Sequence, residues 1–113
     1  AAKSWEKGTA EGYGGGKVWS AMSVDQALDL VYLPTTSPSG DFYGGGRAGD
    51  NNYSTSVVAL KGSTGEVTWH FQFVHHNVFD YDTPTQPGCN VSSQPTSNSH
   101  TTHILATAFM APP

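Results

Sequence analysis

Two histidines and two aspartates lie close together in the stretch VHHNVFDYDTPTQP, residues 74–87. A carboxylate on a loop can accept a proton from a substrate hydroxyl as a general base, or bind a divalent cation. An aspartate followed by Thr and Pro also commonly caps a turn, which is the structural role we expect for Asp82. For Asp80 the residues alone leave the catalytic and the turn-capping interpretations open.

The histidines are weaker candidates for chemistry than the aspartates. His75 and His76 are adjacent, and neighbouring side chains of a strand point to opposite faces, so the two do not easily bind one ion. A zinc site that adds the H-T-T-H stretch, residues 100–103, has poor ligand spacing. We expect one of the two histidines to orient the loop that carries Asp80 through a hydrogen bond, and the other to be exposed.

Composition excludes several classes of function. The chain has 113 residues, 12% of them charged, with a formal net charge of −4. Its five Lys and Arg residues are scattered, so we expect no nucleic-acid partner. No apolar run is long enough to span a membrane, and the first residues lack the apolar region of a signal peptide. Cys89 is the only cysteine, so no internal disulfide can form.

Thirteen glycines and seven prolines favour short strands joined by turns over helices. Apolar, β-branched and aromatic residues predict four strands, at residues 18–25, 30–35, 53–61 and 67–74. The last two strands are joined by the Gly-containing turn 62–66 and form the clearest hairpin. The polar, glycine-rich segments 1–17 and 36–52 are predicted to be loops.

The predicted strands lack a second layer. An antiparallel sheet must bury one face against another element, and the sequence shows no amphipathic helix that could provide it. A propeller meets this need because neighbouring blades cover each other. The predicted fold class is therefore all-β, a fragment of a repeat architecture such as a propeller.

A motif in the hairpin narrows this prediction. The stretch VVALKGSTGEVTWHFQ has the pattern A-L-x-x-x-T-G-x-x-x-W, with matches at Ala59, Leu60, Thr64, Gly65 and Trp69. It resembles the blade repeat of the eight-bladed propellers of quinoprotein dehydrogenases, which use pyrroloquinoline quinone (PQQ). Gly65 suits the positive φ of a tight turn, and Trp69 offers a large apolar surface for burial. The resemblance implies about one and a half blades of an eight-bladed propeller.

A longer resemblance covers residues 17–87. The order LVYLPTTSPSGDFYGGGR, YSTSVVAL and WHFQFVHHNVFDYDTPTQP is similar to the membrane-bound, glucose-type PQQ dehydrogenases and the quinate and polyol dehydrogenases of the same branch. In this family the segment H-(D/N)-x-(W/F)-D carries the catalytic aspartate, which implies that Asp80 is the base. The resemblance also implies that Asp80 lies at a divalent cation, Ca²⁺ or Mg²⁺, that polarises the quinone.

The same resemblance implies roles for two further residues. Trp19 matches a tryptophan whose indole forms the floor beneath the PQQ ring, and the alternative is an ordinary core or inter-blade tryptophan. Ser37 matches the place of a metal-binding Asn in the methanol-type branch. A hydroxyl can serve a hard cation, and a simple turn made by the Ser side chain is equally open. The loop 40–54 is expected to pack over the cofactor mouth. Arg47 is expected to be exposed, and a contact with a carboxylate of PQQ or with a neighbouring blade is the alternative.

The function implied is the oxidation of an aldose such as glucose, with electrons passed to ubiquinone at the periplasmic face of the bacterial inner membrane. Contact with the membrane is expected only through parts that this chain lacks. A quinate, shikimate or other polyol dehydrogenase of the same branch is the first alternative. A non-catalytic propeller scaffold, or an inactive fragment, is the alternative of another class. The isolated chain is expected to be inactive, because a propeller site collects residues from several blades.

The resemblance stops at Pro87. The sequence expectation is a partial propeller domain at residues 1–87 and a divergent, largely disordered tail at residues 88–113. This tail is rich in Ser, Thr and Asn and contains no charged residue, and ILATAFM, residues 104–110, is its only possible strand. The family pattern continues into an apolar strand and a quinone-contacting lysine that this sequence does not show, which favours a shifted reading frame past about residue 87.

Overall fold

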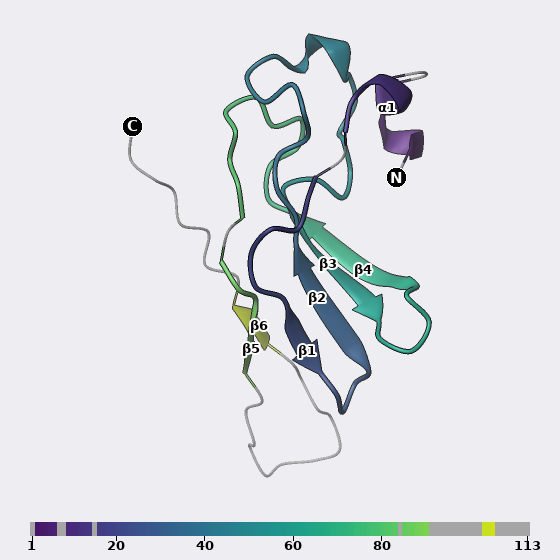
Figure 1. Cartoon of the computed structure of the whole chain (residues 1–113), viewed down its shortest axis with the longest axis vertical. Helices are drawn as coiled ribbons and strands as arrows, with labels where there is room; N and C mark the ends of the chain where they lie inside the picture. The colour runs from purple at the N-terminus through teal and green to yellow at the C-terminus, as the bar shows by residue number, and fades with distance from the viewer. Residues whose placement is uncertain (1, 7–8, 15, 84, 91–102, 106–113) are drawn as a thin grey trace.

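The computed structural model describes residues 2–6, 9–14, 16–83, 85–90 and 103–105. Its main element is one antiparallel sheet in the order β1-β2-β3-β4 (Figure 1). The four strands are Ser23–Asp25, Leu30–Pro34, Ser56–Lys61 and Val67–Gln72. All four predicted strands are therefore present, and the predicted β3–β4 hairpin is confirmed.

Several short elements differ from the sequence prediction. The segment expected to be a loop before β1 contains η1 (Ala2–Ser4) and α1 (Thr9–Gly12), and the next loop contains η2 (Gly44–Gly46). Strand β3 begins three residues later than predicted, at Ser56 rather than residue 53. The reason is backbone conformation, since Tyr53 and Thr55 have φ values of 72° and 45°, which a strand does not accept.

In the tail, the structure describes two strands, β5 (Gly88–Asn90) and β6 (His103–Leu105), which pair antiparallel. Strand β5 lies beside β1 in Figure 1. The Ser23 hydroxyl donates a hydrogen bond to the Pro87 carbonyl, and Gln86 Nε2 donates one to the Met22 carbonyl at 3.2 Å. The rest of the tail, including the first histidine of H-T-T-H, lies outside the described residues.

The core explains why the hairpin motif contains an alanine. Tyr32 pairs with Ala59, and Ala59 pairs with Trp69, so the three residues form one row across β2, β3 and β4. Ala59 is fully buried, and the rings of Tyr32 and Trp69 lie 5.9 Å apart on either side of it. A larger side chain at Ala59 would displace one of the rings. Trp69 is half-buried within this chain.

The remaining sheet surface carries exposed apolar side chains, among them Val24, Val67 and Phe71. In the part of the chain that the structure describes, no helix is long and apolar enough to cross a membrane.

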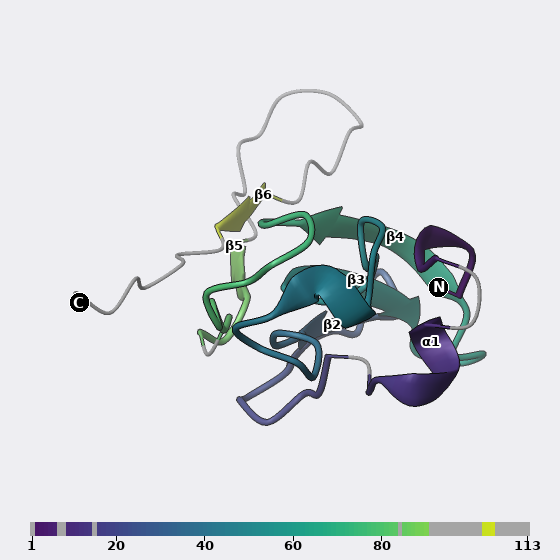
Figure 2. The same ribbon diagram turned by 90° about the horizontal axis from the view of Figure 1, so that it is seen from above.

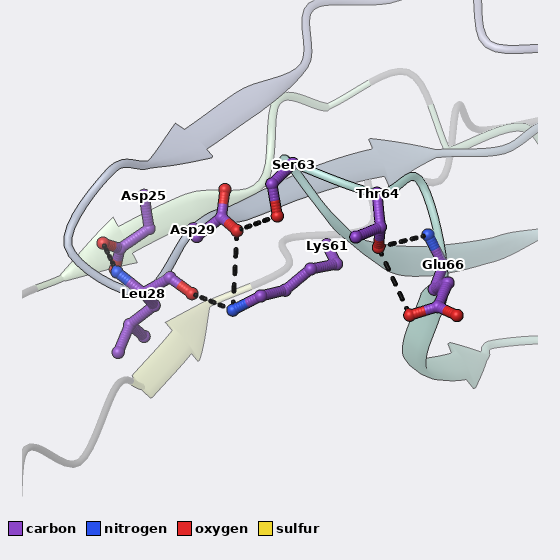
Figure 3. A network of polar contacts seen from close by, with 7 residues as sticks. All are labelled: Asp25, Leu28, Asp29, Lys61, Ser63, Thr64 and Glu66. Carbon is purple, nitrogen blue, oxygen red and sulfur yellow. Dashed lines mark hydrogen bonds and ion pairs between the residues drawn. The ribbon is translucent and has the colours of Figure 1, made fainter.

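One end of the sheet is held by polar contacts among the turns (Figure 3). Asp29 ends the β1–β2 turn with a φ of 54°. Its carboxylate accepts a hydrogen bond from the Ser63 hydroxyl at 2.6 Å and lies 3.5 Å from Lys61 Nζ. The Gly62 N–H donates to the Asp29 carbonyl at 2.8 Å. The β1–β2 turn is thereby attached to the β3–β4 turn.

These contacts predict a pH-dependent contribution to stability. The hydrogen bond from the Ser63 hydroxyl is the largest cause that holds the pKa of Asp29 below its ordinary value of 3.8. Desolvation opposes it, and the smaller effect of the Lys61 charge adds to the lowering. A lowered folded-state pKa stabilises the fold above the unfolded-state pKa, and the stabilisation is lost as the pH falls through the folded value. Ser63→Ala is expected to lower the free energy of unfolding at pH 7 and to have little effect at pH 2. Urea denaturation at both pH values measures this, and equal losses at both would contradict it.

Candidate active site

The residues predicted to do chemistry lie on segments at the opposite end of the sheet from the Asp29 turn. Strands β2 and β4 end there, and β1 and β3 begin there, because antiparallel neighbours alternate in direction (Figure 1). Viewed from above, the segment with η2 lies over the ends of β2 and β3 (Figure 2). Trp19 precedes β1, Ser37 follows β2 and Asp80 follows β4.

Backbone hydrogen bonds connect these segments beyond the regular strands. The Thr36 N–H donates to the Lys17 carbonyl at 2.9 Å, and the Lys17 N–H donates to Thr36 Oγ1 at 3.0 Å. Thr55 N–H donates to the Thr36 carbonyl, and Phe73 N–H donates to the Thr55 carbonyl, each at 2.9 Å. The segment before β1, the loop after β2 and the loop after β4 are therefore joined at one end of the sheet.

Asp80 presents a free carboxylate. It is exposed, its φ is 54°, and within the described part of the chain its side chain has no hydrogen-bond partner. Partial burial, followed by the charges of Asp82 and Asp41, raises the pKa of Asp80 above its ordinary value. The turn-capping interpretation does not fit this geometry, because the cap of this turn comes from Asn77. The Asn77 Oδ1 accepts a hydrogen bond from the Phe79 N–H at 3.0 Å.

The neighbours of Asp80 hold the loop in place. Asp82 Oδ1 accepts a hydrogen bond from the Ser37 N–H at 3.1 Å, so its contact is structural but joins two distant loops and does not cap its own turn. His76 Nδ1 lies 2.9 Å from the Gly49 carbonyl, and the His76 N–H donates to the Asp50 carbonyl at 3.3 Å. His75 is exposed. One histidine thus connects this loop to the loop after β2, and the other faces solvent.

Asn77 is a functional candidate that the sequence reasoning missed. It is 1% exposed, and its Nδ2 lies within hydrogen-bond distance of three acceptors. These are Ser37 Oγ at 2.5 Å, Thr55 Oγ1 at 3.0 Å and the Tyr81 carbonyl at 3.0 Å. The available signal was an Asn two residues before Phe79, the spacing of an Asx turn. Its contacts with Ser37 and Thr55 come from distant segments and leave no local pattern.

The prediction that Arg47 is exposed is wrong. Its side chain is 0% exposed. Nη1 donates to Asn51 Oδ1 at 2.8 Å, and Nη2 donates to the Gly40 carbonyl at 3.1 Å and to the Asn77 carbonyl. Burial lowers the pKa of Arg47, and the charge of Asp41 opposes that shift. A guanidinium can be buried here because its planar donors match several carbonyl oxygens at once.

The glycine run beside Arg47 permits this close packing. A Cβ at Gly44 would lie 2.2 Å from His76 Nε2, and one at Gly46 would lie 1.9 Å from the Tyr13 hydroxyl oxygen. Such distances are not possible without rearrangement, so Gly44 lets the loop with η2 approach the Asp80 loop, and Gly46 lets it approach Tyr13. The loop after β2 therefore packs against the loop that carries Asp80.

Ser37 and Trp19 differ in how accessible their side chains are to a bound cation or quinone. Ser37 is buried, and its Oγ accepts the hydrogen bond from Asn77 Nδ2. A second lone pair of that oxygen remains for a cation, so ligation by Ser37 stays a prediction. Trp19 is 62% exposed, and an exposed indole face can receive a flat ring. Trp19 is therefore not part of the core of this chain. A place between two blades and a role beneath a quinone both stay predictions.

The oxygen donors at this site can be compared with the divalent cation that the family resemblance implies. Asp80 offers a free carboxylate whose neighbouring negative charges, Asp82 and Asp41, a cation would offset. Oxygen donors of this kind suit Ca²⁺ or Mg²⁺. Among the described residues, however, no group of three or more His, Cys, Asp and Glu side chains could hold a metal. The residues present fit one part of a cation site at the quinone, and other ligands must come from elsewhere.

Comparisons with known proteins define the class. Residues 1–107 match the family described as PQQ, the β-propeller domain of glucose, ethanol and alcohol dehydrogenases. The chain belongs to this family. Its four-stranded sheet is part of an all-β PQQ propeller, as predicted, and the cofactor of the family is PQQ.

Individual curated relatives are also dehydrogenases, and each matches about 60% of this chain. The chain is 46% identical over 70 residues to the quinate/shikimate dehydrogenase (quinone) of Acinetobacter baylyi, covering 61% of this chain and 9% of the relative. It is 41% identical over 70 residues to the quinoprotein glucose dehydrogenase of Escherichia coli, with the same coverage of 61% and 9%. The glycerol dehydrogenase large subunit of Gluconobacter oxydans is 46% identical over 69 residues, 60% of this chain and 9% of the relative.

A solved structure confirms the fold. A europium-containing methanol dehydrogenase superposes with a TM-score of 0.74 and 29% identity, covering 90% of this chain and 17% of that one. The chain thus spans about 9% of the length of the curated relatives it matches. The activity of the complete protein is therefore a proposal.

Proposed function

We propose that the complete protein containing this chain is a PQQ-dependent dehydrogenase that oxidises a hydroxyl group of a sugar or polyol. The observation that carries the proposal is the free carboxylate of Asp80. It lies on a loop held in place by buried contacts, at the end of the sheet where Ser37 and the Trp19 segment also lie. Asp80 serves as the base, Trp19 lies against the quinone ring, and Asp80 and Ser37 contact a divalent cation, Ca²⁺ or Mg²⁺.

The residues divide the chemistry in a simple way. When bound, PQQ accepts the hydride from the substrate carbon. Asp80 accepts the proton of the hydroxyl on that carbon, for which its carboxylate must be ionised. A nearby cation would favour the ionised form and oppose the effect of Asp82 and Asp41. Trp19 excludes water from one face of the ring and orients it.

The substrate we propose first is an aldose such as glucose, with ubiquinone as the electron acceptor at the periplasmic face of the inner membrane. Relatives named for glucose match at 37–41% identity. Quinate or shikimate is the second candidate, supported by relatives of that name at 45–46% identity. The division between a propeller part at residues 1–87 and a divergent tail at residues 88–113 remains part of the proposal.

A substrate panel tests the proposal on the complete protein. The protein is loaded with PQQ and Ca²⁺ or Mg²⁺, and reduction of an artificial dye is followed with glucose, quinate, shikimate and glycerol. We expect turnover with at least one of them that disappears when PQQ is omitted. Firm binding of PQQ without turnover on any member of the panel would instead support the non-catalytic scaffold.

A further inference from the structure

The backbone on either side of Asp80 is held by one side chain. Asn77 Oδ1 accepts hydrogen bonds from the Phe79 N–H at 3.0 Å and the Tyr81 N–H at 3.4 Å. Asn77 Nδ2 donates to the Tyr81 carbonyl at 3.0 Å. The carboxamide therefore contacts the residue before Asp80 and the residue after it. The Asp80 side chain itself makes none of these contacts.

Asp80 needs such support because of its backbone conformation. Its φ of 54° lies in the left-handed region, which a residue with a Cβ adopts only when its surroundings stabilise it. Tyr81 and Phe79 do not provide a buried anchor, since both side chains are exposed. The Asn77 carboxamide is the buried group that fixes this turn.

Asn77 is fixed in turn from two sides. Arg47, fully buried, donates a hydrogen bond to the Asn77 carbonyl across 30 residues of sequence. Ser37 Oγ and Thr55 Oγ1, from the loop after β2, accept from Asn77 Nδ2. The turn at Asp80 is therefore connected to the Ser37 hydroxyl through the buried Asn77 side chain, in addition to the hydrogen bond between the Ser37 N–H and Asp82.

We propose that Asn77, anchored by Arg47, is a positioning residue that holds the Asp80 turn in its active geometry and sets its place relative to Ser37. The inference rests on the proposed function for the role of Asp80 as base. It extends that function by assigning two separate roles. Asp80 accepts the proton, and Asn77 holds the backbone of the Asp80 turn in position. A displaced base loses rate more than it loses substrate affinity.

The test compares three variants of the complete protein. Asn77→Ala removes all the carboxamide contacts. Asn77→Asp keeps an oxygen that can accept from the Phe79 and Tyr81 N–H groups. Asn52→Ala is the matched control, because Asn52 lies in the neighbouring loop and its hydrogen bond to Ser4 uses only its backbone N–H. Each variant is measured for kcat, KM, PQQ affinity and hydrogen exchange at the amides of Phe79 and Tyr81.

The expected result has three parts. Asn77→Ala lowers kcat by about 10- to 100-fold and leaves KM and PQQ affinity nearly unchanged. It also makes exchange at the Phe79 and Tyr81 amides faster by about 10-fold or more, because their acceptor is gone. Asn77→Asp restores most of both losses, and Asn52→Ala matches the wild type throughout.

Two results would overturn the inference. The first is a normal kcat in Asn77→Ala in a protein that Asp80→Asn inactivates. The second is loss of PQQ binding together with kcat in Asn77→Ala, with no rescue by Asn77→Asp, which is the pattern of a purely structural residue. Normal turnover in Asp80→Asn would instead contradict the proposed function. In that case unchanged amide exchange in Asn77→Ala would overturn the positioning role as well, and faster exchange would support its structural half.

Discussion

Asp80→Asn is expected to lower kcat of the PQQ-loaded complete protein by about 10²- to 10⁴-fold, the range by which a positioned general base accelerates a reaction. The substitution keeps the size and shape of the side chain. It removes the basic carboxylate, and an amide oxygen does not accept the proton of an alcohol. Because the Asp80 side chain has no hydrogen-bond partner in the described part of the chain, the loop itself should be undisturbed.

Two measurements distinguish loss of the catalytic base from loss of PQQ binding. Turnover is followed by dye reduction, and PQQ binding is followed by fluorescence titration, which we expect to change far less than kcat. Asp82→Asn is the matched control. Its amide oxygen can still accept the Ser37 N–H, and removal of its charge lowers the pKa of Asp80 and so favours the ionised base. Equal turnover in Asp80→Asn and Asp82→Asn would show that Asp80 is not the base.

Arg47→Met is expected to destabilise the folded protein by roughly 3–5 kcal/mol, because buried acceptors that lose a charged donor each cost about 1–3 kcal/mol. The acceptors are Asn51 Oδ1 and the carbonyls of Gly40 and Asn77. Met fills a similar volume but donates no hydrogen bond. The loss is larger than that of a surface cation because the side chain is 0% exposed.

Thermal unfolding of the complete protein measures this prediction. Lys17→Met is the matched control, since the Lys17 side chain is exposed and surface substitutions usually change stability by less than about 0.5 kcal/mol. Arg47→Lys should fall between the two, because a single ammonium cannot reach all the acceptors of a planar guanidinium. An Arg47→Met variant as stable as Lys17→Met would contradict the structural role of this residue.

The strands and the hairpin could be predicted because their signals are local. Apolar and β-branched runs predict β2, β3 and β4, and the positive φ of Gly65, 75°, is that of the turn it was expected to make. The motif from Ala59 to Trp69 is a consequence of one row across three strands, where a small residue fits between two rings. The same motif indicated the family to which the comparisons assign the chain.

The ends of the strands were less predictable than their existence, as the segment before β1 shows. The predicted strand at residues 18–25 is a strand only at Ser23–Asp25. Before it, Lys17 uses its backbone to bind Thr36 instead of a regular neighbour. Whether a backbone group pairs with a strand or with a distant loop depends on the arrangement of the whole end of the sheet, which no short window of sequence contains.

By itself, the sequence predicted the four strands and the β3–β4 hairpin, and its motifs indicated the family and, through that resemblance, Asp80 as the candidate base. Each of these depends on residue type and spacing within a short stretch. Only the tertiary structure decided that Arg47 is buried and that Asn77 holds the Asp80 turn. The hydrogen bonds from Asn77 to Phe79 and Tyr81 are local, but those that anchor Asn77 to Arg47 and Ser37 join residues 30 and 40 positions apart. A charged or polar side chain shows its partners only when folding brings distant backbone oxygens within its reach.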